Sequence, residues 1–207
     1  ITPENGTTTG AGTYPLGALV QLEANPELGY LFDNWTGDAF GVSNPLSLLM
    51  DQNLTVGADF GQDSSDTDND NLTNYQELVV HGTNPNIADS DGDGFNDGLE
   101  VAESSNPNET GDFPTRILTV ISPTNGTVTG GGTYRLGTVA SVLATPALGY
   151  VFNAWTGDGS GTTSPLQLAM SENRTVGTIF GQDQRDPDGD GLSNYEELVL
   201  HGTNPNN

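Results

Sequence analysis

The chain has 207 residues, only 33% of them hydrophobic, and a net charge of −24, because 28 acidic residues are balanced by just four arginines. This charge argues against nucleic acids and anionic membranes, which require a basic face, and it suits either multivalent cations as partners or solubility in salty surroundings. The absence of cysteine excludes disulfides and thiolate metal sites, and no apolar run approaches the roughly 20 residues of a membrane span.

An internal repeat organises the chain. The segment YLFDNWTGD around Trp35 returns as YVFNAWTGD around Trp155, and the same offset of 120 residues relates Tyr14 to Tyr134. Such self-similarity predicts a tandem array of small, turn-rich units rather than one large core. The predicted modules are a β-rich module at residues 1–62, an acidic module at 63–115, a second β-rich module at 116–182 and a partial acidic module at 183–207.

The β-rich modules contain short runs of β-branched and aromatic residues, such as LGALVQLEA and GYLFDNW, which Gly, Pro, Asn and Asp interrupt. This pattern predicts five or six strands per module. Asn5-Gly6 and Asn125-Gly126 stand where tight hairpins need a positive φ. The run RILTV before Ile121 predicts a further strand, whereas its counterpart Ile1 has no residues before it. We therefore expect the chain to be a piece of a longer one, with the first strand of the first β module missing.

Three segments of the second β module carry a family resemblance that extends to their copies in the first module: NGTVTGGGTYRLGT from Asn125, ATPALGYVFNAWTGD and SPLQLAMSENRTVGTIF. They resemble divergent relatives of the internalin B-repeat, which are small modules common in secreted and surface-anchored bacterial proteins. The resemblance implies a small β fold and a role as a spacer or adhesion element without a fixed ligand.

The first acidic module contains the stretch DSDGDGFNDGLE, which begins at Asp89. Its carboxylates occupy positions 1, 3, 5, 9 and 12, and Gly94 occupies position 6, which is the spacing of a calcium loop of the EF-hand kind. Short acids wrap oxygens around one ion, the glycine permits a sharp turn, and the final glutamate contributes two oxygens. Such an oxygen cage prefers calcium to zinc or copper. The predicted ligands of this loop, loop two, are Asp89, Asp91, Asp93, the Phe95 carbonyl, Asp97 and Glu100.

Two further loops share this register, so the sequence predicts about three calcium sites. DTDNDNLTNYQE has Asn71 in place of the turn glycine, which is acceptable because Asn tolerates the left-handed conformation. DPDGDGLSNYEE keeps the glycine as Gly191. The predicted ligands of loop one are Asp66, Asp68, Asp70, the Leu72 carbonyl, Asn74 and Glu77. Those of loop three are Asp186, Asp188, Asp190, the Leu192 carbonyl, Asn194 and Glu197.

The segments after loops one and three, NYQELVVHGTNP and NYEELVLHGTNP, predict short helices, the first of which ends at Gly82. The order of these elements resembles bacterial thrombospondin type 3 repeats: a calcium loop is followed by one short helix, the GTNP connector and another DxDxDG loop. They are also similar to a dockerin, whose duplicated calcium loop and helix bind a cohesin. The GTNP connector and the neighbouring B-repeat-like modules favour the thrombospondin-type resemblance, which implies calcium binding.

The aromatic residues leave a choice between packing and binding. Trp35 and Trp155 occupy matching strand positions and are expected in the cores, although exposed tryptophans would be platforms for sugar rings. Phe40 has Ser160 as its counterpart and lies in a Gly/Ser turn, where we expect it to be exposed. We recognise no nucleophile–base pair or open metal site, so the chain is expected not to be an enzyme.

The predicted fold is mainly β, an elongated array of two small all-β modules, each followed by a calcium-loop and short-helix module. The predicted function is a non-enzymatic, calcium-stabilised spacer or adhesion region of a larger bacterial protein. Its partners would be calcium, neighbouring repeats of the same chain and a surface protein or glycan. Calcium loops of millimolar affinity would be empty in the cytosol, which predicts a secreted or surface location. The alternative is an accessory carbohydrate-binding region of a secreted polysaccharide-acting enzyme.

Overall fold

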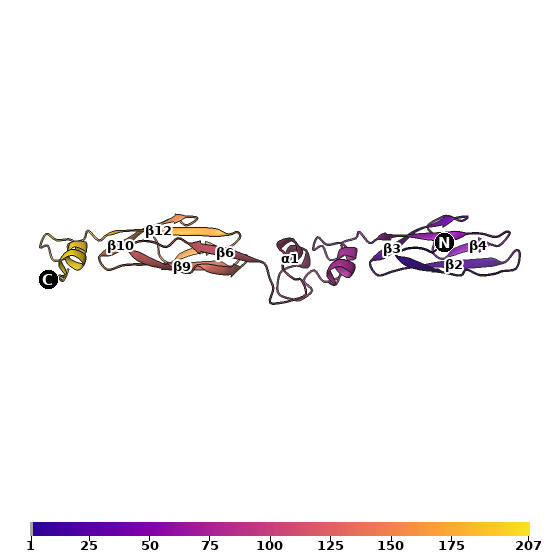
Figure 1. The fold of residues 1–207 in the computed structure, drawn as a ribbon, viewed down its shortest axis with the longest axis horizontal. Coiled ribbons are helices and arrows are strands. Elements are labelled where there is room, and N and C mark those ends of the chain that lie inside the picture. The colour runs from indigo at the N-terminus through magenta and orange to yellow at the C-terminus, as the bar shows by residue number, and fades with distance from the viewer. Residues whose placement is uncertain (1) are drawn as a thin grey trace. The chain divides into compact units, whose positions relative to one another are not determined.

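The computed structural model describes residues 2–207 (Figure 1). The chain divides into two compact units, Ile1–Phe113 (unit 1) and Pro114–Asn207 (unit 2), and each contains a β module followed by an acidic segment. Strands dominate both units, which confirms the predicted mainly β fold class. The finer division into four modules stays a prediction, and Ile1 lies outside the described residues.

The β module of unit 1 consists of two small antiparallel sheets. One sheet has the order β1-β2-β4, and the other pairs β3 with β5. Its strands are β1 (Gly6–Thr9), β2 (Leu19–Pro26), β3 (Tyr30–Gly37), β4 (Leu46–Leu49) and β5 (Val56–Gln62).

The β module of unit 2 repeats this arrangement and adds strands to it. One sheet has the order β11-β9-β7, and the other has the order β10-β12-β6-β8. Its strands are β6 (Thr115–Val120), β7 (Gly126–Thr129), β8 (Gly132–Arg135), β9 (Val139–Pro146), β10 (Tyr150–Gly157), β11 (Leu166–Ala169) and β12 (Arg174–Gln182).

A tryptophan lies at the centre of each core. Trp35 is 1% exposed and Trp155 is 4% exposed, and both rings pack against phenylalanines of their own module. Their indole N–H groups donate to the carbonyls of Ser43 and Thr163, at 2.9 and 2.8 Å. Burial with a satisfied N–H confirms the prediction that these tryptophans are core residues. Phe40 is 85% exposed, as predicted.

The two β modules differ at the strand predicted from RILTV, which is β6. It runs parallel to β12 and antiparallel to β8, and its Leu118 side chain is buried beside Val176 and Met170. Among the described residues of unit 1, no strand pairs with β5 in this way. The counterparts Val56 and Met50 are only half-buried and line an open cavity of about 260 Å³.

The two asparagines that precede the hairpin glycines have the positive φ predicted from the sequence. Asn5 and Asn125 have φ values of 65° and 67°, the left-handed conformation that Asn adopts more readily than most residues. The glycines that follow them have no room for a side chain, because a Cβ on Gly6 or Gly126 would lie 2.6 Å from the ring of Phe60 or Phe180.

The acidic segments contain three short helices. The two helices predicted after loops one and three are present as η1 (Gln76–His81) and η2 (Glu196–His201), and both have π-type hydrogen bonding. Left-handed Gly82 ends η1, as predicted, and donates its N–H to the Glu77 carbonyl. The third helix, α1 (Asp97–Glu103), begins after Asn96, whose side chain accepts the Leu99 N–H. None of the described helices is long and apolar enough to cross a bilayer.

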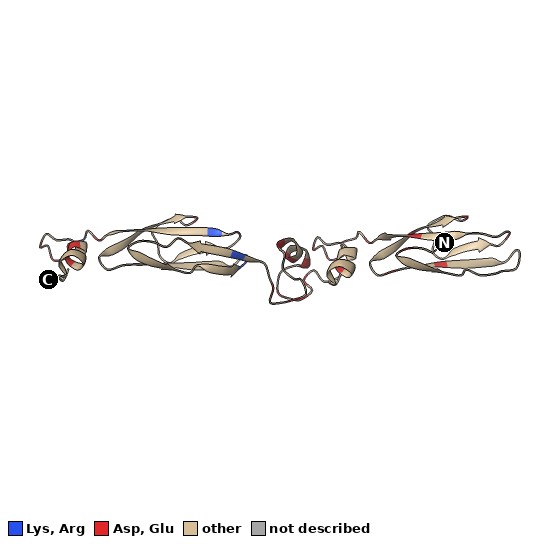
Figure 2. Cartoon of the chain, viewed as in Figure 1, with Lys and Arg blue, Asp and Glu red and all other residues tan. Residues whose placement is uncertain are grey.

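Charge is distributed unevenly over these elements. Acidic residues recur along the loops and short helices, whereas the blue positions on the ribbon of Figure 2 lie on β6 and β12, which contain Arg116 and Arg174. The acidic segments therefore have the highest density of like charge in the chain.

Candidate metal centre

The three acidic loops have the same backbone conformation. In each, the residues at positions 4 and 6 have a positive φ, which turns the chain back on itself twice. Asn71 adopts this conformation at position 6, so it replaces the glycine as predicted. The residues are Asn69 (65°) and Asn71 (81°) in loop one, Gly92 (77°) and Gly94 (99°) in loop two, and Gly189 (77°) and Gly191 (96°) in loop three.

Backbone N–H groups fix the first aspartate of each loop. In loop one, Asp66 accepts the Asn69 N–H at 2.8 Å and the Asn71 N–H at 3.2 Å through its two oxygens. Asp89 and Asp186 accept the equivalent pairs of N–H groups at 2.8 to 3.1 Å. These bonds turn the carboxylate toward the inside of the loop and leave further lone pairs on each oxygen for a ligand.

The aspartate at position 5 is fixed in a similar way, since it accepts the N–H of position 7. The distances are 2.7 Å from Leu72 to Asp70, 2.9 Å from Phe95 to Asp93 and 2.8 Å from Leu192 to Asp190. The backbone thus fixes the orientation of the position 5 carboxylate within the cluster. The carbonyls of Leu72, Phe95 and Leu192 stay predicted ligands.

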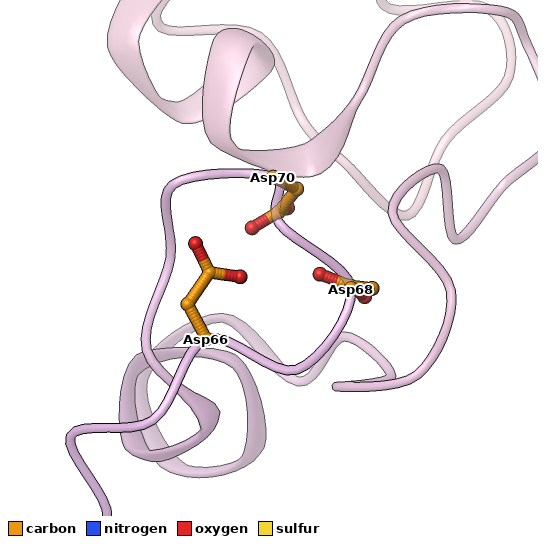
Figure 3. Close-up of side chains that lie close together, drawn as sticks. All are labelled: Asp66, Asp68 and Asp70. Atoms are coloured by element: carbon orange, nitrogen blue, oxygen red, sulfur yellow. The ribbon is translucent and has the colours of Figure 1, made fainter.

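Each loop gathers its first three aspartates into a cluster. Figure 3 shows Asp66, Asp68 and Asp70 of loop one, whose carboxylates come from three sides of the same turn, with ligand atoms within 4.8 Å of one another. Oxygens that contact one calcium ion at 2.3–2.6 Å lie at most about 5 Å apart, so each cluster can hold one ion. The equivalent clusters are Asp89, Asp91 and Asp93 in loop two and Asp186, Asp188 and Asp190 in loop three.

The glutamates at position 12 are buried at the start of the helices that follow. Glu77 and Glu100 are fully buried, and Glu197 is 1% exposed. Neither oxygen of Glu77 receives a hydrogen bond within the described residues, and one oxygen each of Glu100 and Glu197 also lacks a donor. A buried carboxylate without donors is costly unless a cation compensates its charge, so these residues fit a metal ligand better than a structural core group.

Burial also changes the proton affinity of these glutamates. It raises the pKa of Glu77 to about 7, with smaller contributions from nearby Asp68 and Asp70. The pKa of Glu100 likewise rises to about 7, through burial and the charge of Asp91. Burial and Asp188 raise the pKa of Glu197 as well. Each shift has the direction expected of a carboxylate that lacks a compensating positive charge.

The residues at position 9 have different surroundings. Asn74 and Asn194 donate their side-chain amides to Asp63 and Asp183, both at 2.8 Å. Asp97 of loop two accepts the backbone N–H and hydroxyl of Ser90 and lies close to loop one. The structure therefore brings together the carboxylates at positions 1, 3 and 5, and the amide N–H groups of the two asparagines brace the loops. The side-chain oxygens of these asparagines stay predicted ligands.

Asp63 and Asp183 were not expected from the sequence to matter for the loops. Each donates its N–H to a glycine of its own β module, Gly29 or Gly149, at 2.9 Å. Their side chains hold the position 9 asparagines, and the hydrogen bond from Asn74 lowers the pKa of Asp63. The signal that could have found them is the GQD triplet, which precedes both loops at the same offset of 120 residues.

In both units the loop–helix segment packs on the end of its β module. The rings of Tyr30 and Tyr75 meet edge to face at 5.2 Å in unit 1, and those of Tyr150 and Tyr195 do so at 5.3 Å in unit 2. Beside this contact, a Cβ on left-handed Gly29 would lie 2.6 Å from Val79. The position of each loop is thus tied to its β module by hydrogen bonds and by side-chain packing.

Comparisons with known families agree with this geometry. The family described as divergent InlB B-repeat domain matches residues 1–64 and 117–184, which include both β modules. The family described as bacterial TSP3 repeat matches residues 66–88, 89–109 and 186–207, which contain the three loops. No curated protein and no solved structure matches the chain. Since the first family covers more than half of the chain, the protein belongs to the divergent InlB B-repeat domain family and carries bacterial TSP3 repeats, a calcium-binding type, in its acidic segments.

Proposed function

We propose that this chain is a non-enzymatic spacer or adhesion region of a larger secreted or surface protein, and that calcium stabilises it by occupying the three loops. The observation that carries the proposal is the set of position 12 glutamates, which are buried beside aspartate clusters with oxygens that lack donors. Buried negative charge of this kind is costly unless a bound cation or a proton neutralises it.

The connection between loop and β module indicates what the ion would do for the chain. Asp63 donates to Gly29 in β module 1 and accepts the N–H of Tyr75, so the loop is held between the module and its own helix. An ion that joins Asp66, Asp68 and Glu77 would therefore fix η1, and with it the Tyr30–Tyr75 contact, against the β module. Calcium binding and folding of the acidic segment would be coupled.

The calcium affinity expected of such loops supports an extracellular location. Extracellular modules with EF-hand-type loops bind calcium at about 10⁻⁴ to 10⁻³ M, a range that suits the outside of a cell and would leave the loops empty in the cytosol. Both matched repeat families are typical of extracellular bacterial proteins.

The carbohydrate-binding alternative has less support. Stacking against a sugar requires an exposed aromatic ring, but Trp35 and Trp155 are buried in the cores with their N–H groups bonded. Phe40 is exposed, but its counterpart in unit 2 is Ser160, so this aromatic ring is not repeated. A single exposed ring does not require a ligand to explain it.

Thermal unfolding tests the proposal. We expect millimolar calcium to raise the Tm by more than about 10 °C relative to chelator, because each site filled at ten times its dissociation constant contributes about 1.4 kcal/mol. Magnesium at the same concentration should give a much smaller rise, since it demands strict octahedral geometry. Equal melting curves in chelator and calcium would disprove a stabilising role for calcium.

A further inference from the structure

The two units attach loops one and three to their β modules through matching hydrogen bonds. In unit 2, Asp183 donates its N–H to Gly149 at 2.9 Å and accepts the N–H of Tyr195 at 3.0 Å. The Asp183 carboxylate also accepts the side-chain amide of Asn194 at 2.8 Å, and these three bonds form the loop attachment of unit 2. The loop attachment of unit 1 has the same bonds, at 2.9, 3.1 and 2.8 Å, between the equivalent residues Asp63, Gly29, Tyr75 and Asn74.

The loop attachment of unit 2 is reinforced by an ion pair. Arg185 donates from Nε to one oxygen of Asp183 at 2.8 Å and from Nη2 to the other oxygen at 2.6 Å. An ion pair near the surface contributes little to stability unless its geometry is bidentate, as it is here. The Arg185 side chain is 73% exposed, but that of Asp183 is only 8% exposed, so the guanidinium meets a carboxylate that is largely withdrawn from water.

Unit 1 has Ser65 at the position of Arg185. Ser65 donates its backbone N–H to Asp63 at 3.0 Å, as Arg185 does to Asp183 at 3.2 Å, but its side chain has no positive charge. Residues 63–113 contain neither lysine nor arginine, and Arg185 is the one basic residue of this kind in residues 183–207. The two loop attachments therefore differ by a permanent positive charge.

This charge matters most when the loops contain no calcium. Loops one and three each have four acidic side chains in twelve residues, and their mutual repulsion favours opening of the loop. In unit 1 the Asp63 carboxylate adds a fifth negative charge, which accepts hydrogen bonds from the neutral groups of Asn74 and Ser65. In unit 2 the guanidinium compensates the fifth charge, and Arg185 directly precedes Asp186, the first aspartate of loop three.

We propose that Arg185 is a positioning residue that holds loop three on its β module without calcium, through the ion pair with Asp183. The inference rests on the proposed function, because it separates a loop attachment that depends on calcium from one that depends on calcium less. Calcium would then act mainly on the loop attachment of unit 1. Unit 2 would keep loop three and η2 in place at low calcium concentration.

Hydrogen exchange of the full chain in chelator tests this role, since it reports local opening at single amides. The amides of Asp183 and Tyr195 report on the loop attachment of unit 2, and those of Asp63 and Tyr75 report on that of unit 1. Both aspartates follow a glutamine and both tyrosines follow an asparagine, so the intrinsic exchange rates are matched. Because only loop one packs against α1, substitutions carry the test rather than the difference between the units.

Exchanging the residues of the two units gives opposite expectations. Arg185→Ser introduces the residue of unit 1 and should speed exchange at the two unit 2 amides by about fivefold in chelator, the upper range for an ion pair near the surface. Ser65→Arg should slow exchange at the two unit 1 amides by a similar factor. The control Gln184→Ser, at an exposed neighbour of Arg185, should leave all four amides unchanged.

Calcium separates this role from a general structural one. Saturating calcium should return exchange in Arg185→Ser to within about twofold of the unmodified chain, because the ion then holds loop three in place. A general loss of structure would not be restored in this way, so failure of this rescue counts against the inference. Unchanged exchange of Arg185→Ser in chelator would overturn the role of Arg185 and leave calcium binding intact. If calcium slows exchange at neither loop attachment of the unmodified chain, the proposed function is wrong, and the measurements in chelator still decide the role of Arg185.

Discussion

Loops one and three are copies of one sequence pattern. They share a backbone conformation but differ in burial, which separates what the loop sequence determines from what its packing determines. Their backbones have the same left-handed positions, and their first aspartates accept the same N–H groups. Their burial is different, because Asp70 is fully buried and Asp190 is exposed. The loop conformation is thus encoded within twelve residues, whereas burial in loop one comes from α1, which the Gly98–Asp70 hydrogen bond holds in place.

The two β modules make the same point for the cores. Both bury a tryptophan and the phenylalanines around it, but only in unit 2 does a strand such as β6 cover β12 in the described chain. The sheet edge at Val56 instead borders the cavity that Trp35 also lines. The tryptophan core is thus formed by the strands that the two modules share.

The largest effect should come from the two tryptophans. Trp155→Ala and Trp35→Ala should each lower the free energy of unfolding of their own unit by about 3–5 kcal/mol, because each removes a buried indole at the centre of a core. Differential scanning calorimetry in calcium measures both losses, with Phe40→Ala as an exposed control. A loss no larger than that of Phe40→Ala would contradict the core position of either tryptophan.

Glutamates at position 12 allow a comparison of calcium affinity. Glu77→Gln and Glu197→Gln should each weaken calcium binding at their own loop by about tenfold or more, which corresponds to about 1.4 kcal/mol. Only Glu77→Gln should also change the calcium affinity of loop two, because Asp97 of that loop lies in the same buried cluster as Glu77. In the unmodified chain, loop three should bind more weakly than loop two, since its aspartates are exposed.

Isothermal titration calorimetry resolves these affinities, and Glu4→Gln, at an exposed acid far from the loops in sequence, is the matched control. Equal effects of the two glutamine variants on all sites would show that the loops act independently of their packing.

The effect of pH should have opposite signs with and without calcium. The folded state raises the pKa of Glu77 and Glu100 to about 7, above the ordinary value of 4.5, so it disfavours their ionised forms. In chelator, the Tm should therefore rise as the pH falls from about 7.5 to 5.5, because the folded state takes up protons there. In calcium the Tm should fall over the same range, since protons compete with the ion. A Tm that falls with acidification in chelator would contradict the buried-carboxylate description.

The smallest effect concerns position 6 of loop one. Asn71→Gly should change the free energy of unfolding by less than about 1 kcal/mol, because Gly accepts the same φ of 81°. Asn71→Ala should cost about 1–2 kcal/mol, since Ala is strained in the left-handed region. Denaturant unfolding in calcium measures both changes. A loop that tolerates Ala as well as Gly would show that its conformation is not set locally.

Much of the fold could be predicted because its signals are local. Asn5 and Asn125 marked the hairpins, RILTV marked β6, and the spacing from Asp66 to Glu77 marked a loop whose backbone follows that register. The contact between Gly98 and Asp70 could not be predicted, because residues 28 positions apart meet only after both loops have folded. Asp97 was read as a ligand of its own loop, and its place beside Glu77 depends on that contact.

The tyrosine contacts have a practical consequence for spectroscopy. Position 10 of loops one and three is a tyrosine, Tyr75 or Tyr195, whereas position 10 of loop two is Gly98. Terbium carries a larger charge than calcium, accepts the same oxygen ligands and emits when a nearby phenol transfers its excitation energy. Light absorbed by these tyrosines would make terbium luminesce more strongly in loops one and three than in loop two. The chain thus contains its own optical probes of two sites, and both sit against a second tyrosine of the β module, Tyr30 or Tyr150.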